Sequence, residues 1–442
     1  MKVKLLGLLI AALLLTIVFS GCFEETKKTT TVEPKTIYVD DSGGKDYTSI
    51  QDAIDNATDG DTVYVYSGTY YENIDINASI QLNGENVADT IIYGQGHPYS
   101  ELYGGVVNVF ADNVSIKNFI IKSGEPNKYA WSMDDGIVIN SDNNKIQNNY
   151  ITETENAIIL KRANYNLIKD NFIGNNWVCF IFEFASNNTI INNTVSENVE
   201  NRYHASFNYN NKISDNIFTN SSLYILGSYN YIYNNYLTGS GINIEMGDYN
   251  KIYNNILENS QQYSISIEGS MNYSILSIDG SWHVINNTPQ KNIIDNNTIN
   301  NASSAAIMLE FAGNNTISNN VINNAGTGIY MDLVRGNNIF NNMLRNNQYG
   351  IGIVNHIEDW FTKTENNYIF HNNFFNNEKN GYDPDRFNTT WYNVTLLQGN
   401  YWDDYTGIDS DNDGIGDTPY LIENNFGIEN QDLYPLMKPF DI

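Results

Sequence analysis

A nine-residue motif recurs along the chain and limits the possible folds more than any other feature. It reads NNKIQNNYI at residues 143–151 and YNKIYNNIL at 249–257, with Asn two residues before and three residues after a central aliphatic residue. A period of about 22 residues is typical of solenoids, in which each repeat stacks on the next. The central positions are Ile146, Ile168, Ile190, Ile213, Ile232, Ile252, Ile294, Ile317, Ile339 and Ile369.

Between these motifs lie short alternating runs such as GIVIN (136–140) and TGIYMDL (327–333). Three short β-branched segments per period, separated by Asn and Gly bends, predict one coil of a parallel β-helix. Helical repeats would need apolar residues spaced three and four apart, and these segments lack that spacing. The fold class we predict is therefore all-β.

The repeated asparagines are interpreted as structural. Asn tolerates the left-handed backbone region and can hydrogen-bond its counterpart one coil along, so we predict ladders of Asn side chains. Two intervals are long. The 42 residues between Ile252 and Ile294 are interpreted as two coils with Ile275 as a degenerate central residue, and the 30 residues before Ile369 as one coil with an insertion.

The segment before the first coil predicts a helical cap. Ile50, Ala53, Ile54 and Ala57 lie on one helical face, and the pattern breaks at Gly60. Because an open coil end would expose unpaired strand edges, a short amphipathic helix is expected to cover it.

The extreme N-terminus predicts export. Lys2 and Lys4 precede an apolar run, residues 5–19, that is short for a membrane span and ends in small residues. Its end resembles a prokaryotic lipobox, which predicts lipidation of Cys22 and a location on the outer face of the membrane, at the cell surface. An ordinary secreted protein with an incidental cysteine is the alternative.

The stretch GNYWDDYTGIDSDNDGIGDTPYLI (399–422) closely resembles the ending of NosD-like β-helix proteins. With the Asn-rich coils and the cap, the resemblance covers about residues 37–439. It implies a right-handed parallel β-helix of the class shared by carbohydrate-binding proteins and sugar hydrolases. The family's namesake assists maturation of a copper site. We divide the chain into a signal peptide (1–21), a linker (22–36), a capped β-helix (37–398) and a C-terminal segment (399–442).

The C-terminal segment contains an Asp-rich loop that predicts a structural calcium site. Carboxylates and one backbone carbonyl follow the order of a calcium-binding loop, and Gly414 permits the sharp turn. Tyr420 stands where the last bidentate Glu is usual, so Asp404, Glu423 or Asp432 would have to reach in. A solvated acidic turn is the alternative. The predicted ligands are Asp409, Asp411, Asp413, the carbonyl of Ile415 and Asp417.

Aligned coils place an acid seven residues before the central position. The neighbouring apolar residues should point inward, so these carboxylates should point outward from one sheet. Two carboxylates about 5 Å apart repel by roughly 3 kcal/mol at an effective dielectric constant of 20, which favours a cation, a ligand or a shared proton. Such spacing also suits a glycosidase, whereas a solvated acidic face is the simplest interpretation. These acids are Glu183, Glu245, Glu268, Glu310 and Asp332.

Other candidate ligand-binding residues are aromatic or lie in loops. Tyr233 and Tyr253 share one coil position, which suits either sugar stacking or a stiff exposed sheet. Insertions at residues 94–105, 124–136 and 355–366 interrupt the coils, and such insertions often carry binding. Their candidate residues are Trp131, Asp134, Asp135 and Trp360.

Charge and composition exclude some partners. The formal net charge is −28, and −30 after removal of the signal peptide, which holds two lysines and no acids. Such a charge repels phosphate backbones, so no nucleic-acid binding is expected. Copper sites need clustered Met, His or Cys, which the sequence does not group, so no copper is expected.

We therefore expect a monomeric, lipid-anchored protein that binds a glycan or a surface protein. Enzymatic activity is left open and is not favoured; the alternative is a polysaccharide hydrolase or lyase. A second alternative, an accessory protein for an exported metalloenzyme, rests on the resemblance alone.

Overall fold

The computed structural model describes residues 33–95, 104–123, 134–198, 208–276, 282–354, 364–383, 389–424 and 430–442, without the side chains of 270–287. From Lys35 onward these residues form one compact unit. Cys22, Trp131 and Trp360 lie outside the described residues. Among the described residues, no helix has the length and apolar character needed to cross a membrane.

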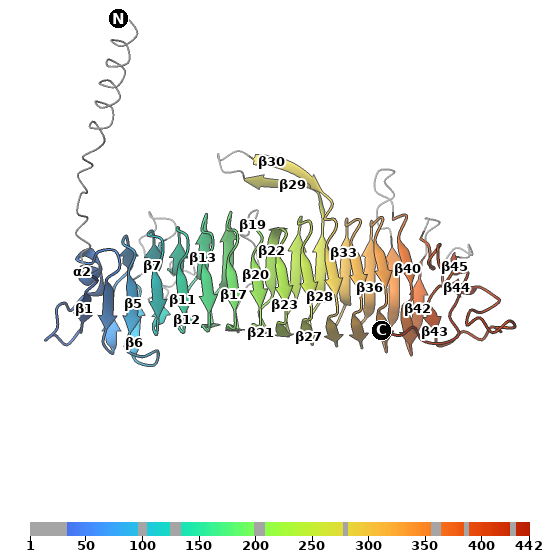
Figure 1. Cartoon of the computed structure of the whole chain (residues 1–442), viewed down its shortest axis with the longest axis horizontal. Helices are drawn as coiled ribbons and strands as arrows, with labels where there is room; N and C mark the ends of the chain where they lie inside the picture. Colours follow the sequence, from blue (N-terminus) through green and yellow to red (C-terminus); the bar gives the residue numbers. More distant parts are fainter. Residues whose placement is uncertain are drawn as a thin grey trace, which may run out of the picture. The chain divides into compact units, whose positions relative to one another are not determined.

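Three parallel β-sheets run along the coils (Figure 1). The first has 14 strands: β1 (Thr36–Val39), β2 (Thr62–Val65), β5 (Gln81–Gly84), β8 (Ser115–Lys117), β11 (Lys145–Gln147), β14 (Leu167–Lys169), β17 (Thr189–Ile191), β20 (Lys212–Ser214), β23 (Tyr231–Tyr233), β26 (Lys251–Tyr253), β31 (Ile293–Asp295), β34 (Thr316–Ser318), β37 (Asn338–Phe340) and β40 (Tyr368–Phe370).

The second sheet also has 14 strands: β3 (Gly68–Tyr70), β6 (Thr90–Tyr93), β9 (Ile120–Lys122), β12 (Tyr150–Thr152), β15 (Phe172–Gly174), β18 (Thr194–Ser196), β21 (Ile217–Thr219), β24 (Tyr236–Thr238), β27 (Ile256–Glu258), β32 (Thr298–Asn300), β35 (Val321–Asn323), β38 (Met343–Arg345), β41 (Asn373–Phe375) and β43 (Tyr401–Trp402).

The third sheet is described in two parts. The first part contains β4 (Ile74–Ile76), β7 (Gly105–Val109), β10 (Asp135–Ile139), β13 (Asn156–Lys161) and β16 (Val178–Glu183). The second part contains β19 (Asn208–Tyr209), β22 (Leu223–Ser228), β25 (Ile242–Glu245), β28 (Tyr263–Glu268), β33 (Ala305–Glu310), β36 (Thr327–Asp332), β39 (Tyr349–Val354) and β42 (Lys379–Tyr382).

The predicted central residues form the core of the solenoid. Each pairs with the central residue of the next coil, as Ile146 does with Ile168 and Ile168 with Ile190. All ten are at most 1% exposed. Burial of this continuous aliphatic column supplies the hydrophobic driving force for stacking, and the all-β parallel β-helix is confirmed.

The asparagines form the predicted ladders. Asn320 is fully buried; its Oδ1 accepts the backbone N–H and Nδ2 of Asn297, and its Nδ2 donates to Oδ1 of Asn342. The preceding residue, Asn319, takes the left-handed conformation with φ 56°. The first Asn of each pair therefore forms the bend and the second forms the ladder, which explains why Asn-Asn pairs recur in the sequence.

The interpretation of residues 252–294 as two coils is wrong. Strands β26, β27 and β28 pair directly with β31, β32 and β33, so the interval is one coil with an insertion. The insertion is an antiparallel hairpin, β29 (Ser270–Leu276) and β30 (Trp282–Asn287), which projects from the coils (Figure 1). Ile275 lies in this hairpin. Lengthening a loop costs little free energy, whereas shifting the ladders would unpair every coil.

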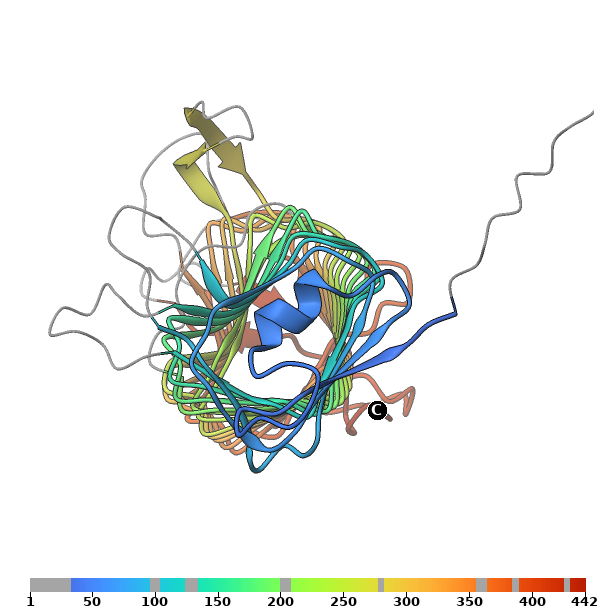
Figure 2. The ribbon, with the colours of Figure 1, turned by 90° about the vertical axis from the view of Figure 1, so that its left-hand side faces the viewer.

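The helix α2 (Ile50–Asp55) lies across the first coil, as predicted (Figure 2). The apolar side chains of the helix, Ile50, Ala53 and Ile54, are buried. The carboxylate of Glu72 accepts the N–H groups of Ile50 and Gln51, which satisfies donors at the helix start.

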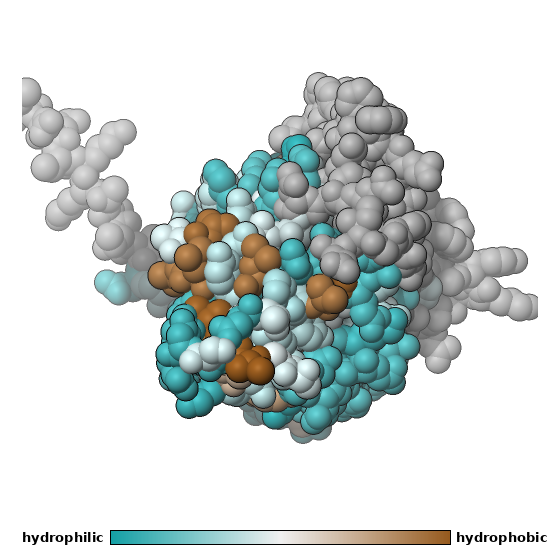
Figure 3. Space-filling view, turned by 90° about the vertical axis from the view of Figure 1, so that its right-hand side faces the viewer, coloured by the Kyte–Doolittle hydropathy of each residue, from teal (hydrophilic) through white to brown (hydrophobic). Residues whose placement is uncertain are grey.

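The other end is closed by the C-terminal segment, including the hairpin of β44 (Tyr420–Ile422) and β45 (Asn430–Asp432). Trp391 and Trp402 are buried there, and the ring of Trp402 stacks on Phe374 at 4.3 Å and on Tyr420 at 4.1 Å. Seen from this end, hydrophobic residues are scattered among hydrophilic ones rather than forming an open core (Figure 3).

Candidate functional site

Four carboxylates form an unbroken row along the third sheet; the three glutamates are half-buried and Asp332 is buried. Glu245 pairs in register with Glu268, Glu268 with Glu310, and Glu310 with Asp332. Their neighbours Ile244, Ile267, Leu309 and Met331 are buried and point inward, as predicted. Because neighbouring strands lie about 4.8 Å apart, successive carboxylates leave the sheet at that spacing.

When residues 252–294 are interpreted as two coils, Glu245 and Glu268 lie on adjacent coils and so do Glu310 and Asp332, but a further coil separates the two pairs. The hairpin insertion removes the extra coil that was expected between Glu268 and Glu310, so the two pairs join. Glu183 lies in the first part of the third sheet, where its carboxylate is 3.6 Å from the Lys161 ammonium. It is not part of the row.

Two tyrosines stand beside the carboxylates. Burial, followed by the charges of Glu268 and Glu310, raises the pKa of the Tyr263 hydroxyl. Burial, followed by the charges of Asp332 and Glu310, also raises the pKa of the Tyr330 hydroxyl. Both hydroxyls therefore stay protonated near neutral pH and can donate hydrogen bonds beside strong acceptors.

A glycine interrupts the adjacent outward row of side chains. Along this row, Tyr330 pairs with Gly352 and Gly352 with Tyr382. A Cβ placed on Gly352 would meet only Cγ2 of Thr327, at 3.4 Å. The two tyrosines are thus two strand spacings apart, about 9.6 Å, with no side chain of the same row between them.

Tyr233 and Tyr253 lie on the first sheet and are not brought to the carboxylates. Their rings stack with centroids 5.0 Å apart and an interplanar angle of 8°. Each ring covers a face of the other, which leaves less surface for a sugar ring.

Asp134 and Asp135 lie at the start of β10, in the first part of the third sheet. Oδ2 of Asp134 accepts Nδ2 of Asn73 at 3.0 Å, and Oδ1 of Asp135 accepts Nδ2 of Asn156 at 2.6 Å. Burial, with smaller effects of the Glu155 and Asp134 charges, raises the pKa of Asp135 to about 7. Burial thus favours the protonated form of this acid.

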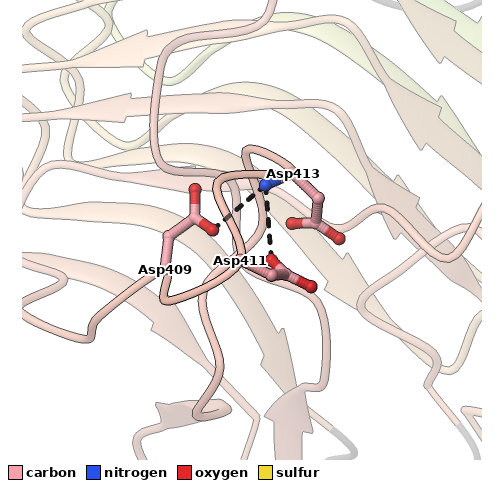
Figure 4. Close-up of side chains that lie close together, drawn as sticks. All are labelled: Asp409, Asp411 and Asp413. Carbon is pink, nitrogen blue, oxygen red and sulfur yellow. Dashed lines mark hydrogen bonds between the residues drawn. The ribbon is translucent and has the colours of Figure 1, made fainter.

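The Asp-rich loop draws three carboxylates together (Figure 4). Asp409, Asp411 and Asp413 each offer an oxygen, and these oxygens lie within 4.8 Å of one another. The backbone N–H of Asp413 donates to Asp409 and Asp411, and that of Gly414 donates to Asp409 at 3.0 Å. The carboxylate of Asp417 instead accepts from the backbone and hydroxyl of Ser410.

None of the three additional acids completes this loop. Asp404 accepts from the Tyr420 hydroxyl and Asn380, and Glu423 lies 2.7 Å from the Lys379 ammonium. Asp432 is fully buried and accepts from Asn400 and Trp402. Each is fixed by other partners, so a cation in the loop would need water or backbone oxygen in the remaining positions.

The chain is similar to solved β-helix enzymes. It matches the catalytic domain of a GH87 alpha-1,3-glucanase in complex with nigerose (TM-score 0.57, 17% identity, 83% of this chain and 69% of that chain). It also matches that domain in complex with tetrasaccharides (0.54, 16%, with the same coverage) and a family 28 exopolygalacturonase of Yersinia enterocolitica (0.53, 12%, 76% and 78%). A comparison with curated proteins finds no match. The chain therefore has the right-handed parallel β-helix fold.

Two family models match parts of the chain. The right-handed β-helix region matches residues 104–227, and NosD, described as a periplasmic copper-binding protein, matches residues 277–407. The predicted resemblance to NosD-like proteins is therefore found in residues 277–407, and the predicted β-helix is found in residues 104–227.

The described side chains do not fit a copper site. Within the described residues, the cluster of potential metal ligands consists of three aspartates, whose hard oxygens suit calcium better than copper. His371 contacts Gln398 and stacks on Phe440, Cys179 is buried, and Met308 and Met331 are packed.

Proposed function

We propose that the protein binds a neutral glycan at the cell surface, on the outer face of the third sheet between β25 and β42. The observation that carries this proposal is the unbroken row Glu245–Glu268–Glu310–Asp332. The structural similarity to saccharide-bound β-helix enzymes supports the choice of ligand class.

The chemistry of this face suits hydroxyl-rich ligands. Carboxylates accept hydrogen bonds from sugar hydroxyls, and charge-assisted bonds of this kind are stronger than neutral ones. Tyr330 and Tyr382 offer apolar ring surfaces on either side of Gly352. An anionic glycan would be repelled by the row, so the ligand proposed is neutral.

A glycan array followed by titration tests this proposal. Gly352→Trp fills the gap beside Tyr330 without touching the carboxylates and should weaken binding at least about tenfold, which corresponds to about 1.4 kcal/mol. Thr194→Trp on the outer face of the second sheet is the matched control and should bind normally. Unchanged binding by Gly352→Trp, with the carboxylate variant Glu310→Gln also unaffected, would reject the third sheet as the binding surface.

A second candidate function, glycan hydrolysis, is favoured by Asp135. An acid with a pKa of about 7 beside other carboxylates has the protonation behaviour of a general acid. The test is release of reducing ends from neutral and acidic polysaccharides, with Asp135→Asn as the inactive variant. Turnover that Asp135→Asn leaves intact would remove this assignment.

Two further proposals concern how the protein is held. Lipid on Cys22 would anchor it to the outer face of the membrane, and mass spectrometry of the mature N-terminus tests this.

Calcium bound by Asp409, Asp411 and Asp413 would act as a structural clip. Residues 435–437 support this role because they hydrogen-bond to both the loop and Asn400 on the last coil.

A further inference from the structure

The strands of the first sheet from β8 to β26 carry lysines and no acids at their outward positions, while Asp170 and Asp215 lie in the bends that follow β14 and β20. In each of these short strands the central residue is buried and the two flanking residues point outward. Across seven successive strands the outward charged residues are all lysines, in a chain whose net charge is −28. We name this surface the lysine face: Lys117, Lys145, Lys169, Lys212 and Lys251.

The sheet register brings the first three lysines close together. Lys117 pairs with Gln147 and Gln147 with Lys169, while Lys145 lies beside both in the neighbouring row. The three residues stand on consecutive coils, so their backbones are separated by about 4.8 Å per coil along the axis. In the sequence they are more than 20 residues apart, which hid the cluster.

The charge of the lysine face is partly compensated, because Asp170 interacts electrostatically with both Lys169 and Lys145. Of the five, Lys169 has a described ion pair, 3.1 Å from Asp170. Lys251 lies 5.7 Å from the ring centroid of Tyr231. By contrast, lysines on other faces are paired with glutamates: Lys122 with Glu153 (3.8 Å), Lys161 with Glu183 (3.6 Å) and Lys379 with Glu423 (2.7 Å).

We propose that the lysine face binds a linear polyanionic glycan laid along the solenoid axis. Ammonium groups repeated along the axis match a polymer whose acidic groups also repeat, and many weak pairs add along its length. Tyr231, Tyr233 and Tyr253 border the lysines and offer ring edges and hydroxyls for sugar contacts. This proposal is independent of glycan binding at the third sheet.

The acids elsewhere on the molecule do not prevent such binding. At physiological ionic strength the Debye length is about 8 Å, so exposed charges on the other sheets are largely screened from a ligand on this one. A second copy of the chain is a poorer occupant. To bind the lysine face, a second copy would have to present its carboxylate row. The hairpin that begins at Ser270, two residues after Glu268 of that row, hinders flat contact between the two sheets.

The test measures binding of the full chain to polygalacturonate, with uncharged dextran as the comparison polymer. Lys117→Gln, Lys145→Gln and Lys169→Gln combined should weaken polygalacturonate binding at least about tenfold and reduce its salt dependence. The matched control combines Lys122→Gln, Lys161→Gln and Lys379→Gln, which changes net charge equally and should alter affinity less than about threefold. Thermal midpoints verify that both variants fold.

Several outcomes would overturn the proposal. These are equal losses in the two variants, no loss in the lysine-face variant, and a loss of dextran binding in the lysine-face variant as large as its loss of polygalacturonate binding. Tighter binding to vesicles of anionic lipid than to polygalacturonate would assign the face to a membrane surface instead. Self-association lost in the lysine-face variant would assign it to a second copy.

Discussion

The central coils and the C-terminal segment solve the same hydrogen-bonding problem in different ways. In the coils, each buried Asn passes its donors to an identical Asn on the next coil, as Asn320 does to Asn342. At Asn400 the ladder has no further coil. Its backbone N–H donates instead to Oδ2 of Asp432 at 2.7 Å.

Asp432 gathers the donors that the end of the ladder leaves over. Its carboxylate also accepts Nε1 of Trp402 at 2.9 Å and the backbone N–H of Tyr434 at 3.0 Å, and the residue is fully buried. A carboxylate has more acceptor capacity than an amide and no N–H of its own. Within the repeat, each Asn therefore provides the acceptor that the previous Asn needs. Only at the end of the ladder must a different residue, Asp432, accept the remaining hydrogen bonds.

The largest expected effect comes from breaking that end. Asp432→Ala leaves three donors, two of them fully buried, without their acceptor; at about 1–3 kcal/mol for each buried donor, a total loss on the order of 4 kcal/mol is expected. Urea unfolding measures it. Asp432→Asn keeps one acceptor oxygen and should cost less. If Ala and Asn substitutions at 432 were both neutral, the terminating role would be refuted.

The same residue predicts a pH effect. Burial, only partly offset by hydrogen bonds from Asn400, Trp402 and Tyr434, raises the pKa of Asp432 to about 6 from 3.8. Because the folded-state pKa lies above the unfolded one, its contribution to stability is greatest below pH 4 and is lost as pH rises to about 6. The loss is on the order of 3 kcal/mol. Asp432→Asn should remove this component of the pH profile, whereas an identical profile would contradict it.

Within the coils, a single break should cost less. Asn320→Ala leaves the buried N–H of Asn297 without its acceptor, which predicts a loss of about 1–3 kcal/mol. The measurement is again the unfolding midpoint, with Asn77→Ala as the control, because Asn77 is exposed and does not take the left-handed conformation. Unchanged midpoints for Asn320, Asn297 and Asn342 variants alike would refute the ladder's contribution to stability.

The smallest and most local effect is expected from calcium removal. Chelation should speed amide exchange in residues 400–424 and 430–439 and leave the central coils protected, because the loop contacts the last coil through residues 435–437. Asp411→Asn with Asp413→Asn should abolish the response, and exposed Asp89→Asn should not. Equal protection from amide exchange with and without calcium, together with no bound metal by elemental analysis, would refute the proposed structural calcium site.

Much of the coil was predictable from the sequence because its contacts repeat. Ile146 and Ile168 meet for the same reason as Ile317 and Ile339, so ten weak patterns support one another. The cap was predictable because its apolar residues follow helical spacing; α2 ends at Asp55, and Ala57 packs just beyond it. The Asp-rich loop was visible because its acids are neighbours in the chain.

The sequence by itself determined the coil, the buried column and the asparagine ladders, since each follows from spacing within one repeat. Only the tertiary structure decided which residues of different coils become neighbours. A coil can expel an insertion such as the hairpin between β28 and β31 at little cost, so chain distance does not report coil distance. For that reason the continuous carboxylate row, the lysine face and the terminating contact of Asp432 with Asn400 appear only once the coils are stacked.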